Sequence, residues 1–144
     1  MIQTEVIERS TKGYSDIHNI TDEVAKKITK SGITQGQVTV FVVGSTAGLT
    51  TVEYEPGLVK DLKNLFEKLI PQNDYYHHEE TWHDGNGFSH VRASLLKPDL
   101  TVPIVNGRMT LGTWQQIILI DFDNCPRQRE VVVQMAGEPR DSSK

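Results

Sequence analysis

The stretch Leu111-Gly112-Thr113-Trp114-Gln115-Gln116-Ile117-Ile118-Leu119-Ile120 decides how this chain folds. It ends in four consecutive aliphatic residues. Successive side chains of a strand point to opposite faces, so this strand must be buried on both. We predict one long strand over residues 108–122. Two amphipathic helices can cover one face of such a sheet, and the other face then requires either closure of the sheet on itself or a neighbouring subunit.

Apolar patterns place the other elements around this strand. Alternating or continuous β-branched runs predict further strands over residues 2–11, 38–43, 49–54, 101–105 and 130–136. Asn106-Gly107 predicts a hairpin turn between residues 101–105 and the long strand. A helical stripe of Ile17, Ile20, Val24 and Ile28 ends at Gly32, a plausible C-cap, and a second helix runs from Pro56 to Pro71.

A short helix over residues 87–96 has Asn86 at its N-cap position. On a helical wheel Phe88, Val91 and Leu95 share one face, which we expect to pack on the core, and His90 lies on the opposite, polar face. Together these elements predict an α+β fold: a single compact domain over residues 1–137 with a mixed, mainly antiparallel sheet and two to three helices. Residues 138–144 are expected to form a frayed tail.

Composition narrows the class of protein. The 144 residues carry a net charge of −4, with 37% hydrophobic and 24% charged residues, as in a soluble globular protein. The sequence contains no run of Lys or Arg residues that could bind the successive phosphates of a nucleic acid, which argues against nucleic acid as a partner. Glu5, Glu8 and Arg9 interrupt any signal peptide, and no stretch approaches the ~20 apolar residues of a membrane span. We therefore expect a cytoplasmic protein in which the single cysteine, Cys125, is a bystander beside a turn.

Four of the five histidines lie between residues 77 and 90. His78, His83 and His90 are five and seven residues apart, a spacing typical of neither metallopeptidases nor zinc fingers. Their density nevertheless favours a site in which these histidines bind a divalent metal, Zn or Mg, with Asp84 or Glu79 completing it. The alternative is a hydrophilic surface loop.

Other residues are candidates for anion binding. The small-residue loop 44–48, with Ser45 and Thr46, either brings backbone amides to an anion or is only a turn. Arg127 and Arg129 point to the same face of a strand and either grip a phosphate or carboxylate or form a solvated edge or a salt bridge. We expect residues 111–116 to help build the floor of the histidine site. Both tryptophans, Trp82 and Trp114, are expected to anchor the core.

The chain resembles the YjbQ family, also called UPF0047 or the secondary thiamine-phosphate synthase family. The resemblance covers roughly residues 1–137. It is carried by Gly44-Ser45-Thr46-Ala47-Gly48-Leu49-Thr50, Glu53, Pro56-Gly57, His78-Glu79, Asp84-Gly85-Asn86-Gly87, Ser89-His90, Leu111-Gly112-Thr113-Trp114-Gln115 and the pair Arg127 and Arg129. It implies a compact α+β homotrimer with a polar pocket around Asn86 and His90 near a subunit boundary. It also implies a weak thiamine-phosphate synthase activity, which joins a pyrimidine diphosphate to a thiazole phosphate.

The resulting hypothesis is an enzyme acting on small phosphorylated heterocycles. Phosphate would be held by Arg127, Arg129, Ser45 and Thr46, and protons or a divalent ion would be handled by His90, Asp84 and Asn86. The alternatives are a metal-dependent hydrolase, with His78, His83 and His90 as ligands, and a non-catalytic ligand-binding protein. Many family members have His where this chain has Ser45, and some have His at Phe88, so His83 is a candidate substitute ligand.

Overall fold

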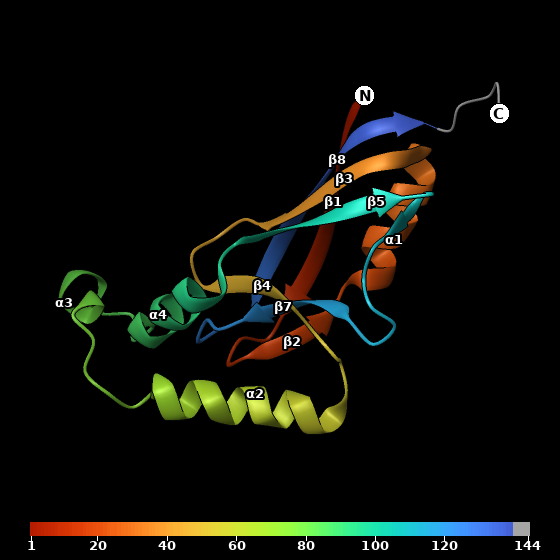
Figure 1. Ribbon diagram of the computed structural model, residues 1–144. Helices are drawn as coiled ribbons and strands as arrows, with labels where there is room; N and C mark the ends of the chain where they lie inside the picture. Colours follow the sequence, from red (N-terminus) through yellow and green to blue (C-terminus); the bar gives the residue numbers. More distant parts are fainter. Residues whose placement is uncertain (140–144) are drawn as a thin grey trace.

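Two antiparallel sheets organise the chain, as shown by a computed structural model that describes residues 1–139 (Figure 1). The large sheet has the order β1-β8-β3-β5-β6, and the small sheet has the order β2-β7-β4. The strands are β1 (Ile2–Thr11), β2 (Asp16–Asn19), β3 (Ile33–Val42), β4 (Ala47–Val52), β5 (Asp99–Val105), β6 (Arg108–Met109), β7 (Gln116–Asp121) and β8 (Arg127–Pro139). The helices are α1 (Thr21–Ser31), α2 (Pro56–Leu69), α3 (His78–Trp82) and α4 (Gly87–Leu96). The α+β class is therefore confirmed: residues 1–139 contain four helices in place of two to three, and every strand pair among them is antiparallel.

Strand β7 is buried on both faces, as predicted, but by this chain alone. Ile117 and Leu119 belong to a core shared with α1 and the large sheet. Ile118 and Ile120 belong to a second core that α2 covers from the other side, so the small sheet lies between the large sheet and α2 (Figure 1). Each buried aliphatic side chain contributes roughly 1.5–3 kcal/mol. No neighbouring subunit is needed to bury this strand.

The predicted long strand over residues 108–122 is wrong, because it divides between the two sheets. Strand β6 pairs with β5 in the large sheet, and β7 lies in the small sheet. In the loop between them, residues 110–115, the N–H of Gly112 donates a hydrogen bond of 3.0 Å to the side-chain oxygen of Gln115. The hairpin prediction is confirmed: Asn106 and Gly107 have φ of 52° and 76° and connect strands in a two-residue turn.

Helix α1 begins at Thr21, later than predicted, because Ile17 lies in β2 opposite Ile120. Its end at Gly32 is as predicted: Gly32 is left-handed (φ 76°) and donates its N–H to Thr29. Helix α2 is also as predicted. The side chain of Glu55 caps it by accepting hydrogen bonds from the first backbone N–H groups.

Helix α4 buries a different face from the one predicted. Phe88 is buried, but Val91 and Leu95 are 42% and 57% exposed. The buried face includes Arg92, whose Nε donates to the carbonyl of Ile70 at 2.9 Å. A hydrogen-bonded arginine thus occupies a place that an apolar pattern assigns to an aliphatic residue.

Two further expectations need correction. Trp82 and Trp114 are 68% and 72% exposed, so neither anchors the core. Strand β8 continues to Pro139, pairing Glu138 with Gln35, two residues past the expected end of the domain. The rest of the predicted tail, residues 140–144, lies outside the described residues. Among residues 1–139, no helix has both the length and the apolar character needed to cross a bilayer.

Candidate active site

A cavity of about 390 Å³ lies where β8 begins, beside the loop that precedes β4 and the start of α4. It is lined by Gly44, Ser45, Thr46, Asn86, His90, Asp123, Arg127, Gln128 and Arg129. A second hollow of about 440 Å³ shares Gly44, Ser45 and His90 with it and continues along α4 to Lys97. His90 therefore lies where the two hollows meet.

His78 and His90 form the centre of the histidine cluster. Their ring centroids are 4.2 Å apart, and His78 Nε2 lies 3.6 Å from Asp84 Oδ1. Helix α3 is fastened to the start of α4 because Glu79 Oε1 accepts a hydrogen bond of 2.7 Å from the N–H of Gly87. This contact brings a histidine of one short helix against a histidine of the next.

Buried Asn86 connects the histidines to the acidic side of the cavity. In one orientation its amide donates to Asp123 Oδ1 at 3.3 Å. In the flipped orientation the amide nitrogen lies 2.8 Å from Asp84 Oδ1 and 3.1 Å from His78 Nε2. The predicted cap bond to its own helix is not made. Asn86 therefore serves the site and not the helix end.

Burial lowers the pKa of His90, and the adjacent His78 lowers it further, against the opposing influence of Asp123, Asp84 and Glu79. The imidazole of His90 is consequently neutral near pH 7. A neutral imidazole at the edge of a cavity can accept a proton or a hydrogen bond from a ligand.

A buried ion-pair network supports the opposite wall. Arg129 donates to both oxygens of Asp121 and, through Nη2, to Thr46 Oγ1 at 2.6 Å. Gly44 packs so closely that a Cβ there would lie 2.6 Å from Arg129 Nη1. The charge of Arg129 is thus neutralised inside the protein, and the side chain holds the loop in place.

Asp123 ties the two arginines to that loop. Its Oδ2 accepts hydrogen bonds from Thr46 Oγ1 at 2.8 Å and from Arg127 Nε at 2.9 Å. Burial would raise the pKa of Asp123, but hydrogen bonds from Thr46, Asn124, Asn86 and Arg127 hold that pKa below the usual range. Asp123 therefore stays ionised and fixes the wall of the cavity.

The four predicted anion contacts divide into two kinds. Arg127 is half-exposed, and its Nη1 and Nη2 have no hydrogen-bond partner within residues 1–139. Ser45 is exposed beside it. Arg129 and Thr46 are buried and already paired, so they position the wall. Arg127 and Ser45 are therefore the more exposed of the four contacts to the cavity.

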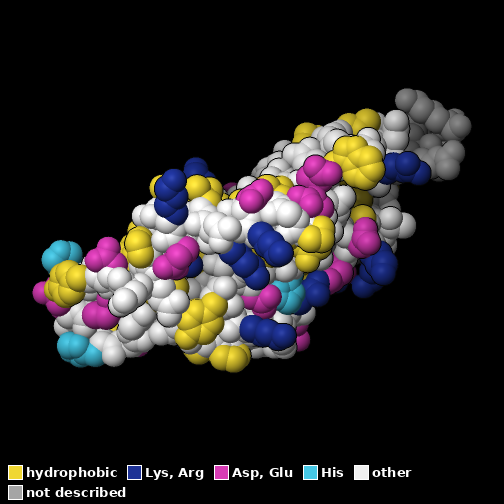
Figure 2. All heavy atoms as spheres, turned by 90° about the horizontal axis from the view of Figure 1, so that it is seen from below, with side chains coloured by type: hydrophobic (Ala, Val, Ile, Leu, Met, Phe, Trp, Pro, Cys, Tyr) yellow, Lys and Arg dark blue, Asp and Glu magenta, His cyan; other side chains and the backbone are white. Residues whose placement is uncertain are grey.

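The predicted three-histidine metal set does not assemble. Within residues 1–139 no group of three or more His, Cys, Asp or Glu side chains is placed to hold one metal ion. His83 is exposed at the end of α3, the end of the molecule where Figure 2 shows exposed histidines. The donor set formed by His78, His90 and Asp84 does not fit a three-ligand metal centre.

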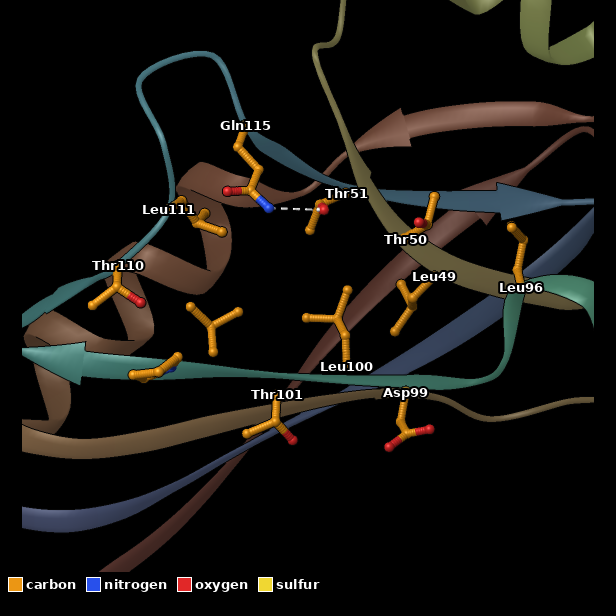
Figure 3. A pocket seen from close by; sticks show the side chains of 12 residues that line it. Leu49, Thr50, Thr51, Leu96, Asp99, Leu100, Thr101, Thr110, Leu111 and Gln115 are labelled. Atoms are coloured by element: carbon orange, nitrogen blue, oxygen red, sulfur yellow. Dashed lines mark hydrogen bonds between the residues drawn. The ribbon is translucent and has the colours of Figure 1, made fainter.

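Two features of the site depart from the sequence prediction. Residues 111–116 do not form its floor but border a separate groove beside β4 and β5 (Figure 3). Asp121 and Asp123 belong to the site, although the sequence suggested only a strand end and a turn. Two acids closing an apolar strand, followed by alternating arginines, were the available signal. Cys125 is half-buried in the turn between these groups.

Fold and cavity together define a small two-sheet α+β protein with a polar histidine pocket. The chain belongs to the UPF0047 YjbQ-like family, whose model matches residues 5–138. A UPF0047 protein of Methanothermobacter thermautotrophicus is 36% identical over 138 residues, covering 96% of this chain and 94% of the relative.

Solved structures of relatives share the fold. A YbjQ-like protein of unknown function from Sulfolobus solfataricus has a TM-score of 0.91 and 30% identity, covering 96% of this chain and 99% of that one. A YjbQ/UPF0047 protein from Clostridium acetobutylicum has a TM-score of 0.80 and 35% identity, covering 90% and 99%. The family assignment made from the sequence motifs is thereby confirmed.

Proposed function

We propose that this protein is an enzyme that binds a small phosphorylated heterocycle in the His90 cavity. The observation that carries the proposal is the position of His90, a neutral imidazole, in a cavity that also exposes Arg127, whose Nε pairs with Asp123 but whose Nη1 and Nη2 have no hydrogen-bond partner within residues 1–139. A base and a cation at one cavity are the minimum for chemistry on a phosphorylated ligand.

Each residue has a distinct role in this proposal. Arg127 and Ser45 hold the phosphate, since a guanidinium offers paired donors to phosphate oxygens. His90 accepts or donates a proton or hydrogen bond at the heterocycle. Asp84 and His78 orient the ring of His90, and Arg129 with its carboxylate partners keeps the loop around Gly44 rigid.

The reaction class that the family resemblance implies is thiamine-phosphate synthesis. A thiazole nitrogen forms a bond to the methylene carbon of the pyrimidine as the bond from that carbon to the diphosphate oxygen breaks. Diphosphate leaves with the electron pair. Arg127 would stabilise the negative charge that develops on the leaving group.

A direct assay tests this function. Purified protein is supplied with the pyrimidine diphosphate and the thiazole phosphate, and thiamine phosphate is measured. We expect Arg127→Gln to lower kcat about 10²–10³-fold, because the charge that develops on the leaving diphosphate is no longer stabilised. His90→Asn removes a hydrogen bond to the heterocycle, and we expect it to lower kcat/KM about tenfold. His83→Asn, an exposed change outside the cavity, is the matched control and should keep the wild-type rate. Equal rates for wild type and His90→Asn would remove His90 from the mechanism, and no product from wild type would refute this reaction.

A non-catalytic ligand-binding protein is the second candidate. It is favoured by the pairing of Arg129 with Asp121 and of Arg127 Nε with Asp123, which leaves little free positive charge for transition-state stabilisation. In that case His90→Asn weakens the binding of inorganic phosphate or a phosphate ester without any turnover to lose. Calorimetric titration of both proteins distinguishes the two candidates.

We also propose that the protein assembles as a homotrimer through the outer face of the large sheet. Figure 1 shows the helices on the other side of this sheet. Val6, Val132 and Phe41 form one cross-strand row on the outer face, and Val6 and Phe41 are 44% and 41% exposed. Exposed Val43 continues this patch towards Gly44 of the cavity. A second copy seated here would approach the mouth of the site.

A further inference from the structure

A second groove, distinct from the His90 cavity, opens between β4 and β5 (Figure 3). It has a volume of about 370 Å³, within the size range of small-molecule sites. Four apolar side chains, those of Leu49, Leu100, Val102 and Leu111, lie beneath it and pack on the main core, whereas most of its accessible surface is polar. Leu96 and the loop of residues 110–115 close its ends.

One wall of the groove is the unpaired backbone edge of β5. The carbonyl of Pro103 accepts a hydrogen bond from Thr110 on the side away from β3. Backbone groups of a strand point alternately to its two sides, so the N–H and C=O of Thr101 point to this same side. Strand β6 pairs only with Ile104 and Val105, and therefore no strand within residues 1–139 covers Thr101 there.

The facing wall is the edge of β4. The N–H of Leu49 donates to the carbonyl of Lys97, away from β7, at 3.0 Å. By the same alternation, the N–H and C=O of Thr51 also point away from β7 and towards the groove. The groove thus offers a backbone donor–acceptor pair on each of its two walls, with the partly exposed side chains of Leu100 and Leu111 between them.

Both ends of the groove are closed by hydrogen bonds. The Leu49–Lys97 bond joins the strands at the narrow end. At the wide end Gln115 Nε2 donates to Thr51 Oγ1 at 3.0 Å, drawn as a dashed line in Figure 3. An extended peptide must continue past both ends of its binding strand, so this closure favours a compact ligand.

Charge separates this groove from the His90 cavity. Among its lining residues only Asp99 is ionisable, and Figure 3 shows that side chain directed away from the groove. Among residues 1–139, no Lys, Arg or His lines this groove to bind a phosphate. The ligand that fits is neutral, apolar on its faces and able to hydrogen-bond along one edge.

We propose that this groove binds a neutral, planar nitrogen heterocycle that carries a hydrogen-bond donor beside an acceptor, as aminopyrimidines and purine bases do. The acceptor nitrogen takes the N–H of Thr101, and the exocyclic amine donates to its C=O. The ring faces lie against Leu100 and Leu111. This site does not depend on the function proposed for His90.

Nuclear magnetic resonance of ¹⁵N-labelled protein, titrated with adenine and 4-aminopyrimidine, tests the proposal. We expect the amide of Thr101 to shift most, with Thr51 next. 4-(Dimethylamino)pyrimidine, which has no N–H donor, should bind at least tenfold more weakly than 4-aminopyrimidine. Equal binding of these two pyrimidines, or no shift of the Thr101 amide, would overturn the proposal.

A pair of variants at one position isolates the backbone donor. Thr101→Pro removes the N–H, and β5 already contains Pro103 two residues on, with its nitrogen towards the same edge. Thr101→Val changes the outward side chain and keeps the N–H. We expect at least tenfold weaker adenine binding in Thr101→Pro, unchanged binding in Thr101→Val and unchanged binding in His90→Asn.

Thermal melting shows whether Thr101→Pro is folded. Should it fail to fold, Leu111→Trp, which fills the groove from its floor, replaces it with the same expected loss. Wild-type affinity in a folded Thr101→Pro or Leu111→Trp protein would refute the site.

Discussion

The guanidinium of Arg129 grips both carboxylate oxygens of Asp121, from Nε to Oδ2 at 2.6 Å and from Nη2 to Oδ1 at 3.0 Å. Both side chains are buried, and Thr11 also donates its hydroxyl to Asp121. The pair joins β8 of the large sheet to β7 of the small sheet. The two sheets are therefore locked together at the wall of the cavity.

Breaking this pair should strongly destabilise the protein. Asp121→Asn removes the nearer counter-charge of a buried guanidinium and leaves only Asp123, whose Oδ2 lies 3.7 Å from Nη2. We expect a loss of about 3 kcal/mol in the free energy of unfolding. Urea denaturation measures it. Glu5→Gln, which removes the partly exposed partner of exposed Lys30, is the control and should change the unfolding midpoint little. Similar midpoints for the two variants would show that the buried pair does not hold the sheets.

Acid should weaken the fold through Asp123. Its pKa lies below that of an aspartate in the unfolded chain, so the folded state binds the proton less readily. The resulting stability is fully present above pH ~4 and is lost as pH falls through the lowered pKa. Below pH ~4 we expect the melting temperature of Asp123→Asn to fall less steeply with decreasing pH than that of the wild type. Parallel curves of melting temperature against pH would contradict this assignment.

His90 should titrate at a lower pH than a histidine of the unfolded chain. Because burial and His78 lower its pKa, protonation costs stability, and the fold should weaken as pH falls below the unfolded value of about 6.5. His78→Asn removes one of the two causes and should raise the pKa of His90. Nuclear magnetic resonance titration of the imidazole measures the pKa of His90 in the wild type and in His78→Asn, with His83→Asn as the control variant. An unchanged titration in His78→Asn would show that the neighbouring ring has no electrostatic influence on His90.

The sequence predicted correctly those elements that depend on residues close together in the chain, such as a helix cap or a hairpin turn. The stripe and cap of α2, the Asn106-Gly107 turn and the burial of β7 all follow from neighbouring residues in sequence. The buried face of α4 does not, because Arg92 is stabilised there by the distant carbonyl of Ile70.

The site shows the same division. The density of histidines led us to expect His78, His83 and His90 at one place, and of these α3 and α4 bring His78 and His90 together. The sequence did not reveal that Arg129 is neutralised by Asp121, since that contact depends on how the two sheets meet. For the same reason it placed residues 111–116 at the wrong cavity.

Assembly is the last property that these observations predict. The burial of β7 by α2 removes the original reason for a neighbouring subunit, and the exposed row of Val6, Val132 and Phe41 provides another. Light scattering at micromolar concentration should give about three times the chain mass of 16.2 kDa. Phe41→Asp should yield monomers, whereas Leu69→Asp, an equally drastic change on exposed α2, should not. Since Val43 links the row to Gly44 of the cavity, the monomeric variant should also lose affinity for the phosphorylated ligand. A wild-type protein of 16.2 kDa would refute the assembly and leave the His90 cavity to one chain.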